Sequence, residues 1–255
     1  MSLFSNLDTA GTEAVEDRLG SDYSAIKAGI YTGKVKQFYA GEASSGARSV
    51  TLILAGGDFG DREYRETIYV TSGKAKGGKN TYEKDGKTYQ LPGFIVANHL
   101  SQCTVGCELK DLAFEDKMVN IYDSELKKEV PKSVPVAVDM IGMEVSVAIL
   151  NVLENKTEKQ GEAYVAIADT RETNNIDKVF NTEHRMTVHE AQAKAKDPET
   201  VAEFWDKWAE KNTGKQRDKT SKNVGAATGK SGAPTSGGAP ASGTAAPRSS
   251  LFGPK

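Results

Sequence analysis

The segment 81–90 constrains the fold of this chain most strongly, because two short strand-like stretches flank the dipeptide Asp85-Gly86. Asp-Gly supplies both positive φ angles of a tight two-residue turn, so it joins two antiparallel strands directly. We predict a β-hairpin over these residues, which we call the finger. Residues 72–80, which contain Gly77 and Gly78, are called its base.

The finger and its base are rich in lysine and tyrosine. They contain Lys74, Lys76, Lys79, Lys84, Lys87, Tyr82 and Tyr89. Alternation along the strands would place the two tyrosines on related faces, while the ammonium groups create a local positive field. Cations for phosphates and flat rings for bases are what the binding of single-stranded nucleic acid requires. The alternative is a solvated surface hairpin with its tyrosines packed underneath.

Patterns elsewhere in the chain predict a mainly β protein. Strands are expected at 29–39, 49–54 and 62–70, with a bend at Gly33, followed by a helix at 94–103 that Gly106 ends. Further strands are expected at 117–122, 134–138, 144–152 and 163–168. Three strands, a helix and then further strands is the order of an OB-type Greek-key barrel, in which the helix caps one end.

The last predicted element is an amphipathic helix that starts at Asp197. Asp197 suits the N-cap, and Pro198 suits the first helical position. The apolar side chains at positions 201, 204, 205 and 208, which include both tryptophans, then share one face. We expect this face to pack on the core, and the docking of a partner is the alternative.

Composition divides the chain into four parts. These are a mobile N-terminal arm (1–25), an OB-type domain (26–186), a helical C-terminal extension (187–212) and a disordered basic tail rich in Gly, Ala, Ser and Pro (213–255). The tail has seven basic residues and one acidic residue, so its charge of +6 leaves −8 for the rest of a chain whose net charge is −2. An acidic body restricts phosphate binding to a local patch. Leu251 and Phe252 form a candidate docking motif in the tail.

Motifs for catalysis are missing from the sequence. It has no Gly-rich phosphate loop and no nucleophile elbow, so we expect neither an enzyme nor a cofactor. His99, Cys103 and Cys107 are spaced four apart, but Gly106 should end the helix before Cys107 and a fourth ligand is missing, so no metal is expected. No apolar run reaches the roughly 18 residues of a membrane span, and two cysteines provide no disulfide framework. We therefore expect a cytoplasmic protein without membrane contacts.

Four short motifs carry a resemblance to a known family. They are KTYQLPGF at 87–94, VNIYD at 119–123, KKEVP at 127–131 and RETNNIDKVF at 171–180. In their order and spacing, they resemble the single-stranded DNA-binding proteins of tailed bacteriophage replication modules, over residues 25–180. The resemblance implies an OB-type fold that coats and protects single-stranded DNA during phage replication, recombination and repair in the host bacterial cytoplasm. It also implies contacts with a phage polymerase, helicase or primase. Such proteins often end in an acidic tail, whereas this tail is basic.

The function expected from the sequence is therefore sequence-tolerant binding of single-stranded DNA. The candidate phosphate-binding residues are Lys34, Lys36, Arg48, Arg62, Arg65, Lys74, Lys76, Lys79, Lys84 and Lys87, and the candidate stacking residues are Tyr31, Tyr39, Tyr64, Tyr69, Tyr82 and Tyr89. The alternative is a β-rich structural or assembly protein that does not bind nucleic acid. Either protein could form a homo-oligomer.

Overall fold

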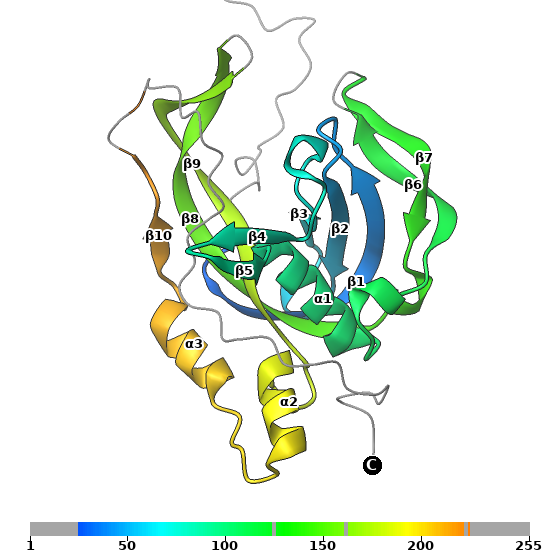
Figure 1. The fold of residues 1–255 in the computed structure, drawn as a ribbon, viewed down its shortest axis with the longest axis vertical. Coiled ribbons are helices and arrows are strands. Elements are labelled where there is room, and N and C mark those ends of the chain that lie inside the picture. Colours follow the sequence, from blue (N-terminus) through cyan, green and yellow to red (C-terminus); the bar gives the residue numbers. More distant parts are fainter. Residues whose placement is uncertain (1–24, 124–125, 161–162, 222–223, 225–255) are drawn as a thin grey trace, which may run out of the picture.

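The computed structural model describes residues 25–123, 126–160, 163–221 and 224 (Figure 1). These residues form a mainly β structure with one large, largely antiparallel sheet, a separate two-stranded sheet and three α-helices. The predicted N-terminal arm up to residue 24 and the tail from residue 225, including Leu251 and Phe252, lie outside the described residues.

The three strands predicted at 29–39, 49–54 and 62–70 are present and form an antiparallel meander. They are β1 (Gly29–Glu42), β2 (Arg48–Ala55) and β3 (Glu63–Tyr69), with the short 3-10 turn η1 (Gly57–Phe59) before β3. β1 pairs with β8 up to Lys34 and with β2 from Lys34 onward. Gly33 lies at this change of partner, where an added Cβ would be 2.7 Å from the Phe59 ring. A register shift between Val35 and Gln37 then allows both Val35 and Phe38 to face the core.

Two long hairpins complete the large sheet. β6 (Glu115–Asp123) pairs with β7 (Lys128–Val136), and after the 3-10 turn η4 (Val138–Met140) β8 (Glu144–Gln160) pairs with β9 (Ala163–Phe180). The sequence prediction ended both strands of the second hairpin too early: it gave 144–152 for β8 and 163–168 for β9. The error has a physical cause: each strand continues through a run of polar residues, at 154–160 in β8 and at 169–175 in β9, where no apolar alternation marks a strand.

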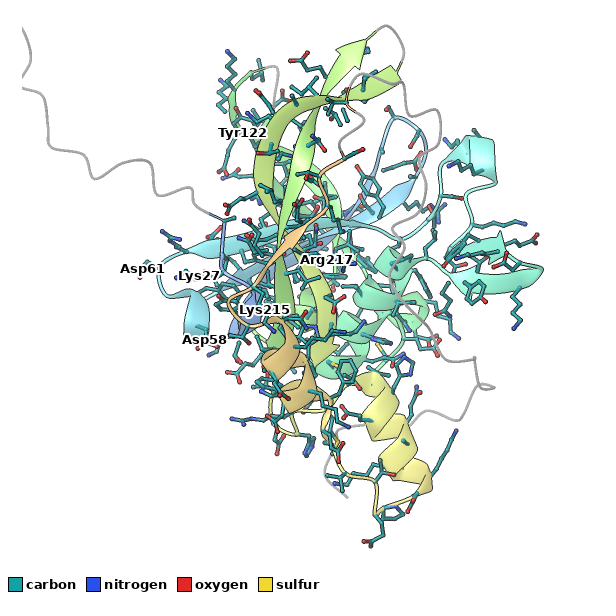
Figure 2. All side chains as sticks on the ribbon, turned by 90° about the vertical axis from the view of Figure 1, so that its left-hand side faces the viewer. Lys27, Asp58, Asp61, Tyr122, Lys215 and Arg217 are labelled. Carbon is teal, nitrogen blue, oxygen red and sulfur yellow. The ribbon has the colours of Figure 1, made fainter. Side chains whose placement is uncertain are left out.

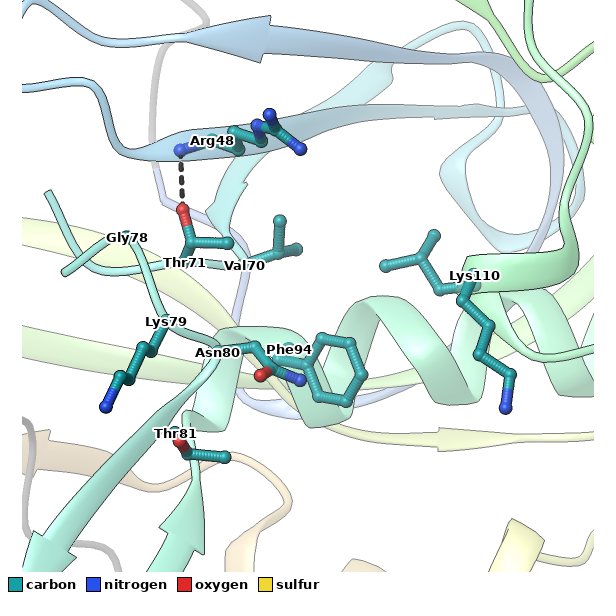
Figure 3. A pocket seen from close by; sticks show the side chains of 10 residues that line it. Arg48, Val70, Thr71, Gly78, Lys79, Asn80, Thr81, Phe94 and Lys110 are labelled. Atoms are coloured by element: carbon teal, nitrogen blue, oxygen red, sulfur yellow. Dashed lines mark hydrogen bonds between the residues drawn. The ribbon is translucent and has the colours of Figure 1, made fainter. Parts of the chain in front are cut away.

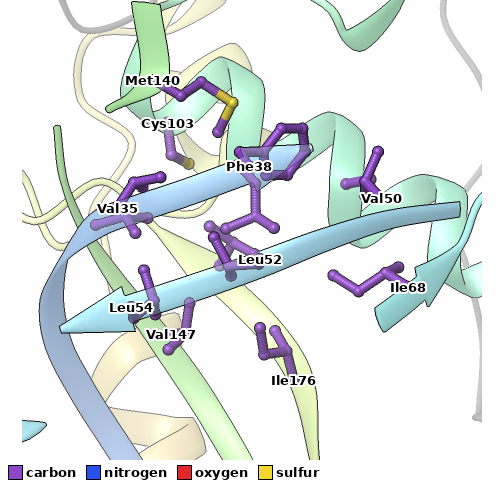
Figure 4. Packing of buried hydrophobic residues seen from close by; sticks show 14 of the residues in the cluster. Val35, Phe38, Val50, Leu52, Leu54, Ile68, Cys103, Met140, Val147 and Ile176 are labelled. Atoms are coloured by element: carbon purple, nitrogen blue, oxygen red, sulfur yellow. The ribbon is translucent and has the colours of Figure 1, made fainter. Parts of the chain in front are cut away.

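Helix α1 (Pro92–Thr104) is the helix that was predicted at 94–103. It contacts β3, β8 and β9 and closes one end of the core. The main core lies between this helix and the strands, and Figure 4 shows how the side chains of β1, β2 and β8 meet there. Its fully buried members include Phe38, Leu52, Leu54, Leu100 and Val147.

The sheet is not closed by strand pairing, because β3 and β9 form no ladder with each other. A side chain bridges them instead. Oε2 of Glu66 on β3 accepts a hydrogen bond from the backbone N–H of Ile176 on β9 at 2.9 Å and another from the Tyr64 hydroxyl at 2.6 Å. Burial raises the pKa of the Glu66 carboxyl, and the hydrogen bonds that it accepts partly offset this effect.

The C-terminal helices differ from the prediction of one helix starting at Asp197. α2 (Val188–Lys196) has Asp197 as its C-cap, and α3 (Phe204–Asn212) begins only at Phe204. Glu190 explains this boundary: its Oε1 accepts hydrogen bonds from the N–H groups of Glu203 and Phe204 at 2.9 and 2.8 Å, while its Oε2 completes the capping box of α2. The cap of α3 therefore comes from the preceding helix, and a sequence-local motif does not reveal it.

The tryptophan face of α3 packs on the protein, as expected. Trp208 is buried, and its Nε1–H donates to Oδ2 of Asp177 at 2.7 Å. Trp205 meets the ring of Phe180 edge-on at 5.0 Å, and the Arg185 guanidinium lies over the Trp205 ring, 5.3 Å from its centroid. Val201, which precedes α3, is exposed instead.

The predicted disordered tail starts too early at residue 213. Strand β10 (Gln216–Asp218) adds in parallel to β8, opposite 151–153. The side chain of buried Asn151 holds this strand and the first described residues together: its Oδ1 accepts from Gln216 Nε2 at 2.9 Å, and its Nδ2 donates to the Ile26 carbonyl at 3.2 Å. Composition could not reveal this strand, because all three of its residues are polar. It is held by backbone pairing with β8 and by the hydrogen bond between Gln216 and Asn151.

Candidate nucleic-acid interface

The finger forms as predicted. β4 (Thr81–Lys84) pairs with β5 (Lys87–Gln90), and Asp85 and Gly86 both have positive φ angles, 52° and 70°. Tyr82 and Tyr89 lie directly opposite each other, and their rings stack at 5.6 Å. Both rings are half-buried. One face of each ring is thus covered by the other, and a base could approach only the remaining surface.

The lysines of the finger and base are all exposed. Lys84 and Lys87 form a directly opposed cross-strand pair, an arrangement of like charges that an anion would stabilise. Lys74 is paired with Glu42 at 3.2 Å, whereas Lys79, Lys84 and Lys87 form no ion pair with the described residues. Figure 2 shows the finger projecting from the body on the side opposite the turn that carries Asp58 and Asp61.

Hydrogen bonds hold the base of the finger in place. The Ser72 N–H donates to the Lys79 carbonyl at 2.8 Å, and the Lys79 N–H donates to Ser72 Oγ at 3.0 Å. The 3-10 turn η2 (Lys74–Lys76) lies between them, and the Lys74 N–H donates to the Ser45 carbonyl at 2.9 Å in the β1–β2 loop. The finger is thereby tied to the large sheet.

A cleft of about 630 Å³ opens where the base meets β2, the end of β3 and helix α1. We call it the basal cleft. Three cationic residues line it, Arg48, Lys79 and Lys110, together with the ring of Phe94, and none of its lining residues is acidic. In Figure 3, Arg48 lies across the cleft from Phe94, with Lys79 and Lys110 on either side.

Sequence reasoning identified Arg48 and Lys79 but missed Phe94 and Lys110. Phe94 was assigned only to the predicted helix, and Lys110, in the 3-10 turn η3 (Leu109–Asp111), lay outside every predicted element. Lys110 also forms an ion pair with Glu108, which does not line the cleft: its Nζ lies 2.8 Å from Glu108 Oε2, and this hydrogen bond raises the Lys110 pKa. It therefore stays cationic at neutral pH.

The remaining cationic candidates, and the candidate stacking residue Tyr69, are spread along the meander of β1, β2 and β3. Arg65 and Tyr69 lie on the outer face of β3, and the Tyr69 side chain is 53% exposed. Lys34 and Arg62, both exposed, and Lys36, which pairs with Glu63, lie at the other end of the strands. Six register positions separate the Ala55–Glu63 pair from the Ser49–Tyr69 pair, which is roughly 20 Å at the rise of a strand. The structure therefore does not bring Lys34, Lys36 and Arg62 together with the finger.

Two of the tyrosine candidates are buried, which opposes base stacking, and a third is half-buried against a neighbouring ring. Tyr64 is buried in the main core, where burial raises its pKa well above the ordinary value. Tyr39 is buried in a smaller cluster beneath the β6–β7 hairpin. The half-buried Tyr31 stacks on Phe59 at 5.7 Å, and its hydroxyl donates to the Lys27 carbonyl at 2.8 Å. Tyr69 is exposed, whereas Tyr82 and Tyr89, like Tyr31, are half-buried and stacked against one neighbouring ring.

The His99, Cys103 and Cys107 group behaves as a packed helix end. Burial lowers the His99 pKa to about 4 and raises the Cys103 pKa to about 12. The His99 ring meets His189 edge-on at 5.1 Å, and the Cys107 carbonyl accepts from Ser101 Oγ at 2.8 Å. Among the described residues, no group of three or more His, Cys, Asp or Glu side chains could hold a metal ion.

Comparisons with known proteins identify no family for this chain. No family model matches the sequence, and no curated protein matches it. In the described part of the chain, no helix combines the length and apolar character needed to cross a membrane.

Proposed function

We propose that this protein binds single-stranded DNA without strong sequence preference, through the finger and the basal cleft. The observation that carries the proposal is the grouping of Arg48, Lys79, Lys84 and Lys87 beside aromatic rings, on a chain whose charge is otherwise acidic. A strand of DNA needs this combination, because cations neutralise phosphates and ring faces stack on bases. Lys79, Lys84 and Lys87 form no ion pair with the described residues, so their charge is available to phosphates.

The topology supports an OB-type arrangement as the scaffold. β1, β2 and β3 form a meander, α1 follows β3, and β8 returns to pair with the first half of β1. β9 then approaches β3 through the Glu66–Ile176 hydrogen bond, a contact between the two strands that a closed five-stranded barrel would pair. The resemblance to phage replication proteins adds the expected role, which is to coat and protect single-stranded DNA during replication, recombination and repair. Contacts with a polymerase, helicase or primase are a further prediction of that resemblance.

The mechanism requires no catalytic group. Lys79, Lys84 and Lys87 would neutralise phosphates along the finger, and Arg48 would do so at its base. For single strands each phosphate contact contributes about 0.7 to the slope of log affinity against log salt. Four contacts therefore predict a loss of roughly 50-fold in affinity between 50 and 200 mM salt.

The proposal is tested by fluorescence anisotropy with labelled oligo-dT and with a duplex of equal length, at 50 and 200 mM salt. The test uses the full chain and a version ending at Ser221, which removes most of the basic tail but keeps β10. We expect both versions to prefer the single strand. If neither binds oligo-dT at 50 mM salt, the proposal fails and a structural or assembly role becomes the better account.

A matched pair of variants locates the interface. Replacing Lys79, Lys84 and Lys87 by alanine should weaken oligo-dT binding and lower the salt slope by about 2. The control replaces the exposed lysines Lys194, Lys196 and Lys211 of the C-terminal helices, and should change neither quantity appreciably. Equal losses in both variants would mean that charge alone, without the finger, accounts for binding.

A further inference from the structure

The backbone on both sides of the basal cleft is held in place by the fold. Arg48 is held at the start of β2: its N–H donates to Thr71 Oγ1 at 2.9 Å, and its carbonyl accepts from the Val70 N–H at 2.9 Å. On the other side, Phe94 lies in the first turn of α1. The helix can approach β3 only because residue 93 is glycine, since a Cβ there would lie 2.2 Å from the Tyr69 carbonyl oxygen.

The lining of the cleft matches the chemistry of one nucleotide. The half-buried Phe94 ring offers a surface for a base, and Arg48 and Lys79 offer positive charge for the adjoining phosphates. Asn80 and Thr71 add polar groups that can meet the edge of any base, which suits sequence-tolerant binding. A volume of about 630 Å³ lies within the usual range for small-ligand sites.

The cleft is also continuous with the finger. Asn80 and Thr81, which line the cleft, lead directly into β4, and the Asn80 carbonyl accepts from the Leu91 N–H at 2.8 Å where the chain returns. A nucleotide in the cleft would thus be followed along the same strand by nucleotides beside Lys84 and Lys87. The cleft and the finger then act as one surface, in which the cleft fixes the position of the strand.

We propose that the basal cleft is a nucleotide subsite, in which one base stacks on Phe94 while its phosphates lie between Arg48 and Lys79. This inference rests on the proposed function, because it assigns part of the same DNA interface. It adds an aromatic residue that contributes to affinity independently of salt, whereas the lysines of the finger contribute through charge.

The test replaces Phe94 by leucine in the full chain, which keeps an apolar side chain but removes the ring. Its control is Phe114→Leu, because Phe114 is also half-buried against the same core but lies outside the cleft. Loss of one stacking ring should weaken oligo-dT binding by about 5- to 150-fold with an unchanged salt slope. Phe114→Leu should stay within about twofold of the wild type. Arg48→Ala should both weaken binding and lower the salt slope by about 0.7.

Photo-crosslinking gives a second readout that does not depend on how well the variants fold. The full wild-type chain is irradiated with oligo-dT that carries 5-iodouracil, and the crosslinked peptides are mapped. We expect a crosslink at Phe94. If the wild type binds oligo-dT but Phe94 forms no crosslink and Phe94→Leu binds like Phe114→Leu, the subsite is wrong while the proposed function survives. If the wild type does not bind oligo-dT, both are wrong.

Discussion

The hydrogen bonds of Glu66 should determine how firmly β9 is held against β3. Glu66→Ala removes the acceptor shared by the Tyr64 hydroxyl and the Ile176 N–H. Each buried donor left without a partner costs about 1 to 3 kcal/mol. The variant also relieves the cost of burying a carboxylate, which opposes this loss. We therefore expect the free energy of unfolding to fall by about 2 to 4 kcal/mol, a large part of the total for a single domain.

Urea denaturation followed by tryptophan fluorescence and circular dichroism measures this change. The control is Glu63→Ala on the same strand, which removes the exposed pair with Lys36 and should cost less than about 1 kcal/mol. Tyr64→Phe in the Glu66→Ala background should be less damaging than in the wild type, because the hydroxyl is already without its acceptor. Equal stability of Glu66→Ala and Glu63→Ala would refute the reasoning.

The pH dependence provides an independent check on the same residue. The pKa of Glu66 is raised in the folded protein, so the folded state binds the proton more tightly than the unfolded state. The stabilising contribution of this carboxyl is therefore present below the unfolded pKa and lost as pH rises through the folded pKa. The stability of the wild type relative to Glu66→Gln should increase as pH falls from 7 towards about 4.5. A difference that does not change with pH would contradict the assigned burial.

Two further predictions concern helix α1. Gly93→Ala should destabilise the protein by at least about 1 to 3 kcal/mol in urea denaturation, because its Cβ would lie 2.2 Å from the Tyr69 carbonyl oxygen. Gly41→Ala, whose nearest neighbour would be Ser49 Oγ at 3.3 Å, is the control, and equal costs would argue against close packing at Gly93. The second prediction concerns His99, whose pKa is lowered to about 4 in the folded protein. The free energy of unfolding should therefore decrease by roughly 3 kcal/mol as pH falls from 6.5 to 4, because only the unfolded state takes up the proton readily. His99→Asn should remove this acid-dependent loss and His184→Asn should not, so an unchanged pH profile for His99→Asn would exclude His99 as its source.

Local patterns predicted the elements whose causes are local. The Asp85-Gly86 turn, the three-stranded meander and α1 follow from turn chemistry and from apolar spacing over a few residues. The start of α3 did not follow, because its cap is Glu190, thirteen residues before Glu203 in the chain. The end of β8 after residue 152 and the part of β9 after residue 168 were missed, because the polar runs at 154–160 and 169–175 leave no periodic apolar signal.

In the candidate site, too, features with local causes could be predicted and features that depend on tertiary contacts could not. Lysines on the finger could be predicted, because an exposed hairpin displays whatever charge its sequence carries. The orientation of the tyrosines could not, since the register shift between Val35 and Gln37 decides that Phe38 faces the main core and Tyr39 the opposite side. Phe94 and Lys110 are far from Arg48 in sequence, and only the tertiary fold brings them to one cleft.

The position of Asn151 has a consequence for the connectivity of the fold. Its amide meets both Ile26 and Gln216, and the Gly214 N–H donates to the Ala28 carbonyl at 2.8 Å, so the two ends of the described body are neighbours. A short linker could join these ends, and new termini could be opened at an exposed turn such as Asp85-Gly86. In such a circular permutant every strand would keep its present partners while the order of synthesis changed. The architecture is therefore set by which segments pair, and the place where the chain begins is incidental to it.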